Sequence, residues 1–223
     1  MQLILFDCDG TLVDSQLVIH TAMSRAFERS AVAPPDRQRA LSIVGLSLHE
    51  AVRRLLPGGE EGMLQEIANG YKAAASELRE DPAFAAPFFP GARETLMTLA
   101  GRTDVVLGLA TGKSRRGVDR LIATEGLEGV FGVIQTADSA PSKPHPAMIL
   151  QAMASAGASE SQTIMIGDTT FDIDMAREAR VTGIGVAWGY HPVDALVQSG
   201  ADRIVESYAD LRSALGVGGE GGA

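Results

Sequence analysis

The chain has 223 residues, of which 45% are hydrophobic and 21% charged, and this composition is typical of a globular protein with a sizeable core. The formal net charge of −9 argues against nucleic acid or an anionic membrane as a main partner. No run reaches the ~20 apolar residues of a membrane-spanning helix, and the single cysteine, Cys8, excludes an internal disulfide and favours a reducing, cytoplasmic compartment.

The first predicted strand is residues 2–6, which are apolar after Gln2 and form too short a run for a helix. The next run of this kind begins only at residue 104, far beyond an ordinary crossover connection. Apolar residues in between recur at steps of three and four, which predicts helices within 19–26, 48–55 and 64–78. The sequence therefore predicts a small helical domain inserted after the first strand.

Strand and helix patterns alternate after this insertion, which favours a doubly wound α/β fold with a parallel sheet. The later strands are predicted at 104–110, 130–135, 162–166, 183–187 and 203–205. The predicted domains are an α/β core of residues 1–14 and 88–215, a helical cap of residues 15–87, and a disordered tail of residues 216–223.

Two carboxylates follow the first strand directly. Asp7 and Asp9 are two residues apart, so on an extended chain both side chains point towards one place at the carboxyl end of the strand. Gly10 permits a sharp turn after them. A lone pair of this kind can also cap a turn, so the interpretation depends on the rest of the chain.

Other polar residues follow later strands at the same predicted edge of the sheet. Thr111 and Gly112 end the second strand and offer a hydroxyl and backbone N–H groups, and Asp168 ends a later one. Lys143 precedes a proline, which favours extended backbone. Acids that share a site need a cation with a preference for oxygen ligands, so the pattern predicts Mg²⁺. The metal and Lys143 together could hold a phosphate dianion.

The segment Asp7-x-Asp9-Gly10-Thr11, with Thr111, Lys143 and the group Gly167-Asp168-x3-Asp172, resembles the four motifs of the haloacid dehalogenase (HAD) superfamily. The resemblance implies a Rossmann-like core with a helical cap between the first two motifs. Asp9 distinguishes the phosphate-transferring members from the dehalogenases, which lack an acid there. The segments FDCDGTLVDS, VGLSLHEAV, KPHP and VAWGY resemble the phosphoglycolate phosphatases within this superfamily.

The resemblance also implies a role for each motif residue. Asp7 would be the nucleophile that forms an aspartyl-phosphate, and Asp9 the general acid and then the general base. Asp7, Asp168 and the Asp9 carbonyl would hold the metal. Thr111 and Lys143 would act in catalysis, and the expected phosphate-binding residues are Asp7, Gly10, Thr11, Thr111, Gly112 and Lys143.

Two features allow two interpretations, and two others are expected to have one role each. Asp172 could support Lys143 or the metal, or it could belong to the N-terminal cap of the helix that follows. The basic segment 113–117 could attract an anionic substrate, but such a helix start is usually only solvated. Tyr190 is expected to pack a loop. The tip of the cap, residues 44–48, is expected to help set specificity.

The predicted protein is therefore a Mg²⁺-dependent phosphatase that acts on a small organic phosphate monoester, phosphoglycolate first. A sugar phosphomutase or a pyrophosphatase of the same fold is the alternative, and a non-catalytic phosphate-binding module is the remaining class. The expected partner is a small phosphorylated metabolite, without nucleic acid or membrane, and the expected assembly is a monomer or homodimer.

Overall fold

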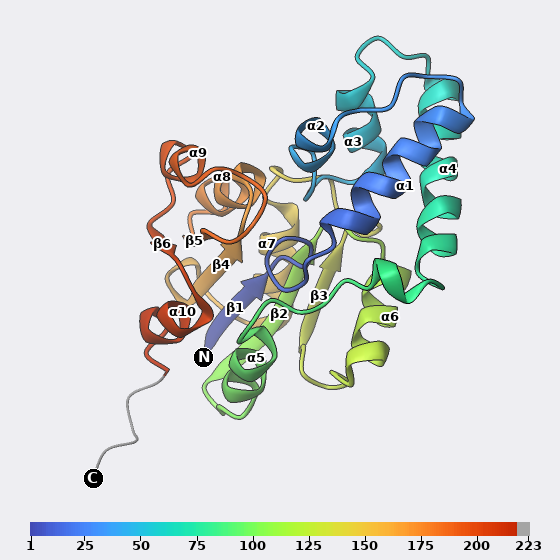
Figure 1. The fold of residues 1–223 in the computed structure, drawn as a ribbon. Helices are drawn as coiled ribbons and strands as arrows, with labels where there is room; N and C mark the ends of the chain where they lie inside the picture. The colour runs from blue at the N-terminus through green and yellow to red at the C-terminus, as the bar shows by residue number, and fades with distance from the viewer. Residues whose placement is uncertain (218–223) are drawn as a thin grey trace.

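A parallel sheet forms the centre of the protein in the computed structural model, which describes residues 1–217 (Figure 1). The strands of this part of the chain are β1 (Gln2–Phe6), β2 (Val105–Thr111), β3 (Val133–Thr136), β4 (Thr163–Gly167), β5 (Thr182–Val186) and β6 (Arg203–Val205). All neighbouring strands are parallel, and their order is β3-β2-β1-β4-β5-β6. The predicted α/β class with a doubly wound parallel sheet is confirmed.

Helices cover both faces of this sheet. They are α5 (Ala92–Ala100), α6 (Arg115–Glu125), α7 (Ala147–Ala156), α8 (Thr170–Glu178), α9 (Val193–Gln198) and α10 (Tyr208–Ala214). Alternate residues of β1 enter different cores, because neighbouring strand side chains point to opposite faces. Ile4 and Phe6 pack with residues of α5 and α10, whereas Leu3 and Leu5 pack with residues of α7 and α8.

Only helices and loops connect β1 to β2, as expected. They are α1 (Gln16–Arg29), α2 (Arg37–Leu41), α3 (Leu48–Leu55), α4 (Glu61–Leu78) and the short 3-10 helix Pro82–Phe84; a second 3-10 helix, Glu160–Gln162, precedes β4. Helices α1 and α4 run side by side above the carboxyl edge of the sheet (Figure 1). Residues 16–78 are called the cap below, and the domain boundaries at 14/15 and 87/88 stay predictions.

The cap has its own hydrophobic cluster, and one core residue takes part in it. Phe27 of α1, Val52 of α3 and Ile67 of α4 are buried there. Phe171, from the first turn of α8, joins the same cluster, and the Arg54 guanidinium lies 4.9 Å from the centre of its ring. The cap and the sheet domain are therefore joined by apolar packing as well as by the chain.

Two boundaries differ from the prediction by more than one residue. Strand β3 begins at Val133 and not at residue 130, because Val130 and Phe131 pack against the core from the preceding loop and give the same apolar pattern. The predicted tail includes Gly216 and Val217, yet Val217 is buried and its N–H donates to the Arg212 carbonyl at 2.8 Å. The remaining tail residues, 218–223, lie outside the described part.

Within residues 1–217, no helix combines the length and the apolar character needed to cross a bilayer.

The packing of the cap cluster leads to a prediction about the free energy of unfolding. Phe27→Ala should lower the free energy of unfolding by about 3–5 kcal/mol, because Phe27 is only 2% exposed and its removal leaves a cavity among the cap helices. Urea denaturation measures the change. Leu17→Ala on the same helix is the matched control, since Leu17 is 51% exposed and its loss should cost less than about 0.5 kcal/mol. Equal costs for the two variants would contradict the packing described.

Candidate active site

The pairing of β1 with its two neighbours brings three predicted site residues to one edge. Phe6 is level with Leu109 of β2 and with Ile166 of β4. The N–H of Asp7 extends the second pairing by donating to the Ile166 carbonyl at 2.9 Å. Thr111 is the last residue of β2, and Asp168 follows β4 directly. Ligands of open α/β sheets bind at this carboxyl edge.

A buried lysine joins two acids at this edge. The Lys143 ammonium lies 2.9 Å from Oδ1 of Asp7 and 2.6 Å from Oδ1 of Asp172, and all three side chains are at most 1% exposed. Burial opposes the charge of Lys143, but the attraction of Asp172 and then of Asp7 outweighs it, so the pKa of Lys143 lies above its usual value. Lys143 is therefore a permanent cation inside the site.

Asp7 has one oxygen without a partner. Oδ1 lies 2.9 Å from the Lys143 nitrogen, whereas the buried Oδ2 has no hydrogen-bond donor among the described residues. Burial, reduced by the attraction of Lys143 and increased by the nearby Asp172, raises the pKa of Asp7 from 3.8 to about 6. A buried carboxylate with free lone pairs is suited to meet a metal ion or an electrophile.

Asp168 is held from two sides. Its Oδ1 accepts a hydrogen bond from the Thr11 hydroxyl at 2.8 Å, and its Oδ2 accepts one from the Tyr190 N–H at 2.9 Å. Gly10 has a φ of +89° and passes so close that a Cβ there would overlap the carboxylate. Burial and the neighbouring Asp172 and Asp7 raise the pKa of Asp168 well above its usual value.

Thr11 therefore serves a different partner from the predicted one. Its hydroxyl donates to Asp168, so the side chain is not free for a phosphate in this arrangement. The Thr11 carbonyl accepts hydrogen bonds from the Trp188 indole at 3.1 Å and from the Tyr208 hydroxyl at 2.7 Å. Thr11 thus fixes the loop after β1 and orients the Asp168 carboxylate.

Asp172 combines the two interpretations that the sequence left open. Its Oδ2 accepts hydrogen bonds from the Thr169 N–H at 3.0 Å and the Thr169 hydroxyl at 2.7 Å, in the capping box at the start of α8. Its Oδ1 accepts a hydrogen bond from Lys143. The same carboxylate therefore caps a helix and anchors Lys143.

Asp9 lies in a separate, more open group. The Lys113 ammonium is 2.7 Å from each of its two oxygens, and the Ser15 hydroxyl donates to Oδ1. Ser15 precedes α1, and its N–H donates to the Tyr190 hydroxyl at 2.9 Å. The attraction of Asp9, which outweighs burial, raises the pKa of Lys113.

Lys113, Ser15 and Tyr190 are the residues that the sequence analysis missed. Lys113 stands in a basic segment that has the pattern of a solvated helix start, and Tyr190 was expected only to pack. One signal was present for Lys113. It is two residues beyond Thr111, in a turn at the same edge, and its N–H donates to the Thr111 hydroxyl at 3.3 Å.

The tip of the cap touches the core beside Gly112. A Cβ on Gly112 would lie 2.4 Å from the Leu46 carbonyl oxygen and 2.5 Å from that of Gly45. The Ser47 N–H donates to the Ser142 hydroxyl at 2.8 Å, next to Lys143. Residues 44–48 therefore lie against the site, largely through backbone atoms, and their role in specificity stays a prediction.

The arrangement fits a metal ion. One carboxylate oxygen from each of Asp7, Asp168 and Asp172 lies within 4.8 Å of the others. Asp172 already accepts hydrogen bonds from Lys143 and Thr169, so Asp7 has the oxygens most available for a metal, with Asp168 beside it. Oxygen ligands of this kind suit a hard divalent cation.

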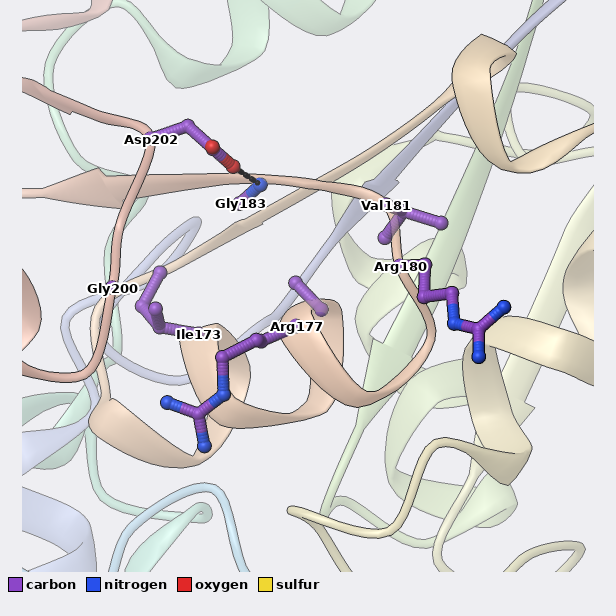
Figure 2. Close-up of a pocket in the computed structure, with 8 residues that line it drawn as sticks. Ile173, Arg177, Arg180, Val181, Gly183, Gly200 and Asp202 are labelled. Atoms are coloured by element: carbon purple, nitrogen blue, oxygen red, sulfur yellow. Dashed lines mark hydrogen bonds between the residues drawn. The ribbon is translucent and has the colours of Figure 1, made fainter.

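A separate hollow lies at the opposite edge of the sheet (Figure 2). It is lined by Gly183 near the start of β5, by Asp202 before β6, and by Arg177 and Arg180 at the end of α8. The Asp202 carboxylate accepts a hydrogen bond from the Gly183 N–H at 2.8 Å. None of the acids or lysines described above lines this hollow.

The parallel sheet, the helical insertion after β1 and the acid–lysine cluster define a hydrolase of the HAD type, and comparisons with known proteins agree. The model of the "Haloacid dehalogenase-like hydrolase" family matches residues 4–186. The chain is 34% identical to "Probable phosphatase IndB" of Dickeya dadantii, over 94% of this chain and 91% of that protein. It is 27% identical to a phosphoglycolate phosphatase of Synechococcus elongatus, over 96% and 97%.

A solved structure supports the same assignment. The chain resembles the crystal structure of a hydrolase from Pseudomonas syringae with a TM-score of 0.85 and 25% identity, over 97% of this chain and 98% of that one. The chain belongs to the haloacid dehalogenase-like hydrolase family. The predicted superfamily is confirmed, while the roles of the individual site residues stay predictions.

The raised pKa of Asp7 makes a pH-dependent prediction for metal-free protein. The folded value of about 6 exceeds the unfolded 3.8, so the contribution of Asp7 to stability is full below pH ~3.8 and is lost as the pH rises through 6. This difference corresponds to about 3 kcal/mol. Asp7→Asn should therefore be more stable than the wild type at pH 7.5 in EDTA, and the gain should shrink at pH 4, as measured by urea denaturation.

Asp119→Asn is the control for this experiment, because Asp119 is exposed and forms a surface ion pair with Arg115. Its effect should be small at both pH values. A destabilised Asp7→Asn at pH 7.5 would mean that the attraction of Lys143 exceeds the cost of burying the carboxylate.

The contact at Gly112 makes a second prediction. Gly112→Ala should reduce turnover at least about tenfold, because the new methyl group meets two carbonyls and displaces the cap tip. Gly101→Ala is the control, since its nearest atom would lie 3.5 Å away and its φ of −73° is helical. Steady-state kinetics and circular dichroism measure the two variants. Unchanged kinetics for Gly112→Ala would show that the position of the cap tip against Gly112 does not matter for turnover.

Proposed function

We propose that the protein is a Mg²⁺-dependent phosphatase that hydrolyses a small organic phosphate monoester through a covalent aspartyl-phosphate. The observation that carries the proposal is the buried Asp7 carboxylate, whose Oδ2 has no donor among the described residues and whose Oδ1 faces the Lys143 ammonium at 2.9 Å. Leaving buried oxygens unsatisfied is costly, so such a group is expected where a ligand completes it. A nucleophile has the same requirement, because its lone pair must be free to attack.

The metal would be held by the carboxylates of Asp7 and Asp168, as the donor set described above allows, and by the Asp9 carbonyl. When bound, Mg²⁺ would neutralise negative charge on Asp7 and on the phosphate, which otherwise repel each other. Thr11 and Tyr190 keep Asp168 oriented for this purpose. Lys143 supplies a second fixed cation and holds Asp7 in place.

In the first half of the reaction, an Asp7 oxygen attacks phosphorus and the bond to the leaving alkoxide breaks. Asp9 gives the alkoxide a proton, and Thr111 with the Gly112 N–H binds the other phosphoryl oxygens. In the second half, Asp9 takes a proton from water while the water oxygen bonds to phosphorus. The bond between Asp7 and phosphorus then breaks, which releases inorganic phosphate and restores the carboxylate.

Phosphoglycolate is the first substrate to test, because a relative similar over nearly the whole chain is named for it. The sequence resemblance within the superfamily supports the same choice. The net charge of −9 supports a small metabolite rather than nucleic acid as the partner. The single buried cysteine is consistent with a cytoplasmic setting, and a monomer or homodimer completes the proposal.

The test is a panel of phosphorylated metabolites with Mg²⁺ or with EDTA, followed by release of inorganic phosphate. Turnover should require the metal and be highest for phosphoglycolate or a similar small monoester. Asp7→Asn should lose about 10³-fold or more in kcat and form no covalent phosphoenzyme. Asp119→Asn is again the control, and it should retain wild-type turnover.

Other outcomes identify the alternatives. Conversion of a hexose 1-phosphate to the 6-phosphate with a bisphosphate primer would indicate a phosphomutase. Hydrolysis confined to pyrophosphate would indicate a pyrophosphatase. Binding of phosphate without turnover of any compound would indicate a non-catalytic module and would refute the proposal.

A further inference from the structure

The two lysines at the carboxyl edge of the sheet are paired with different acids. Lys143 is buried and contacts Asp7 and Asp172. Lys113 is 26% exposed at the side chain, and Asp9 is its only ion-pair partner among residues 1–217. Each of the two acids assigned to the chemistry thus has a lysine of its own, and Lys113 matches none of the motif positions identified in the sequence.

The backbone of Lys113 is fixed on both sides, so its side chain starts from a defined place. Its N–H donates to the Thr111 hydroxyl, and its carbonyl accepts a hydrogen bond from the Ala137 N–H at 3.3 Å. The next residue, Ser114, caps α6 by accepting a hydrogen bond from the Gly117 N–H. Lys113 therefore projects from a turn that β2, β3 and α6 together hold.

The ammonium contacts both oxygens of one carboxylate. Its nitrogen lies 2.7 Å from Oδ1 and 2.7 Å from Oδ2 of Asp9, and Ser15 holds Oδ1 from the other side. Two charge-assisted hydrogen bonds to one group restrict its rotation far more than a single bond does. Without them, Asp9 would be held only by Ser15, at the entrance to the cap.

We propose that Lys113 is a positioning residue for Asp9 in the reaction. This inference rests on the proposed function and concerns the step in which the Asp9 carboxylate takes a proton from water, because both of its oxygens contact the Lys113 ammonium. Proton transfer requires the carboxyl group within hydrogen-bond reach of the reacting oxygen. A displacement of about 1 Å can cost 10²-fold in rate. Lys113 acts through Asp9 and not through the substrate.

The experiment is a double-mutant cycle of Lys113→Met and Asp9→Asn, assayed with p-nitrophenyl phosphate and Mg²⁺. This substrate has a leaving group that departs without a proton, which helps to keep turnover of the Asp9 variant measurable. Lys113→Met should lower kcat about 10–100-fold and change KM less than threefold. In the Asp9→Asn background, the same substitution should change kcat less than twofold, because its effect passes through Asp9.

Lys113→Arg should recover most of the lost kcat, because a guanidinium keeps the charge and can bond both carboxylate oxygens. Lys72→Met, on the exposed surface of α4, is the control for loss of a lysine charge and should behave as the wild type. Equal losses of kcat in the wild-type and Asp9→Asn backgrounds would overturn the inference. A raised KM with unchanged kcat would also overturn it, since Lys113 would then bind substrate directly.

Thermal unfolding in EDTA separates this inference from the proposed function. It is measured on the four proteins of the cycle, which are the wild type, Lys113→Met, Asp9→Asn and the double variant. If Lys113 holds Asp9, the changes in Tm of the two single variants should not add in the double variant. Additive changes would refute the contact whatever the activity. If the wild type has no phosphatase activity, the proposed function fails, and Lys113 then has no reaction to serve even where the Tm changes are coupled.

Discussion

The site depends on one electrostatic constraint, the burial of the Lys143 ammonium between two carboxylates. A single charge removed from water costs several kcal/mol, and breaking a buried pair leaves an uncompensated charge. Here one ammonium is shared by the buried carboxylates of Asp7 and Asp172. The buried charges are tolerated because each offsets the desolvation of another, and Oδ2 of Asp7 is left without a partner among the described residues.

This constraint links parts of the chain that are distant in sequence. Asp7 ends the central strand, Lys143 lies in the loop between β3 and α7, and Asp172 stands in the first turn of α8. Asp172 also satisfies the N-terminal N–H groups of that helix through the capping box with Thr169. The stability of α8 and the position of the Lys143 ammonium therefore depend on the same side chain, so fold and site cannot be optimised separately.

The sequence was most informative where a short apolar run ends in a polar residue. Such endings located Asp7, Thr111 and Asp168, because parallel strands bring their carboxyl ends to one edge. The helical insertion was equally clear, since no apolar run typical of a strand interrupts its periodicity. Strand β3 was placed too early, because apolar loop residues that cover a core have the same local pattern as a strand.

Contacts that depend on side-chain direction were not predictable. Lys113 has the sequence pattern of a solvated helix start, and only the fixed turn after β2 directs it to Asp9. The Thr11 hydroxyl belongs to Asp168 because of how the loop after β1 closes on Trp188 and Tyr208. The contact of the cap tip with Gly112 depends on how whole helices pack against each other, and the periodicity of apolar residues does not predict that packing.

Phe171 belongs to α8 by chain and to the cap by packing, and this has a consequence for ligand entry. Any separation of the cap from the sheet domain exposes the Phe171 ring to water, which costs about 1.5–3 kcal/mol. This penalty alone would hold the open form to roughly one molecule in ten to one in a hundred and fifty at rest. Because Phe171 adjoins Asp172, the ring that packs into the cap and the carboxylate that holds Lys143 share one helical turn, so a movement of the cap away from α8 would act on both.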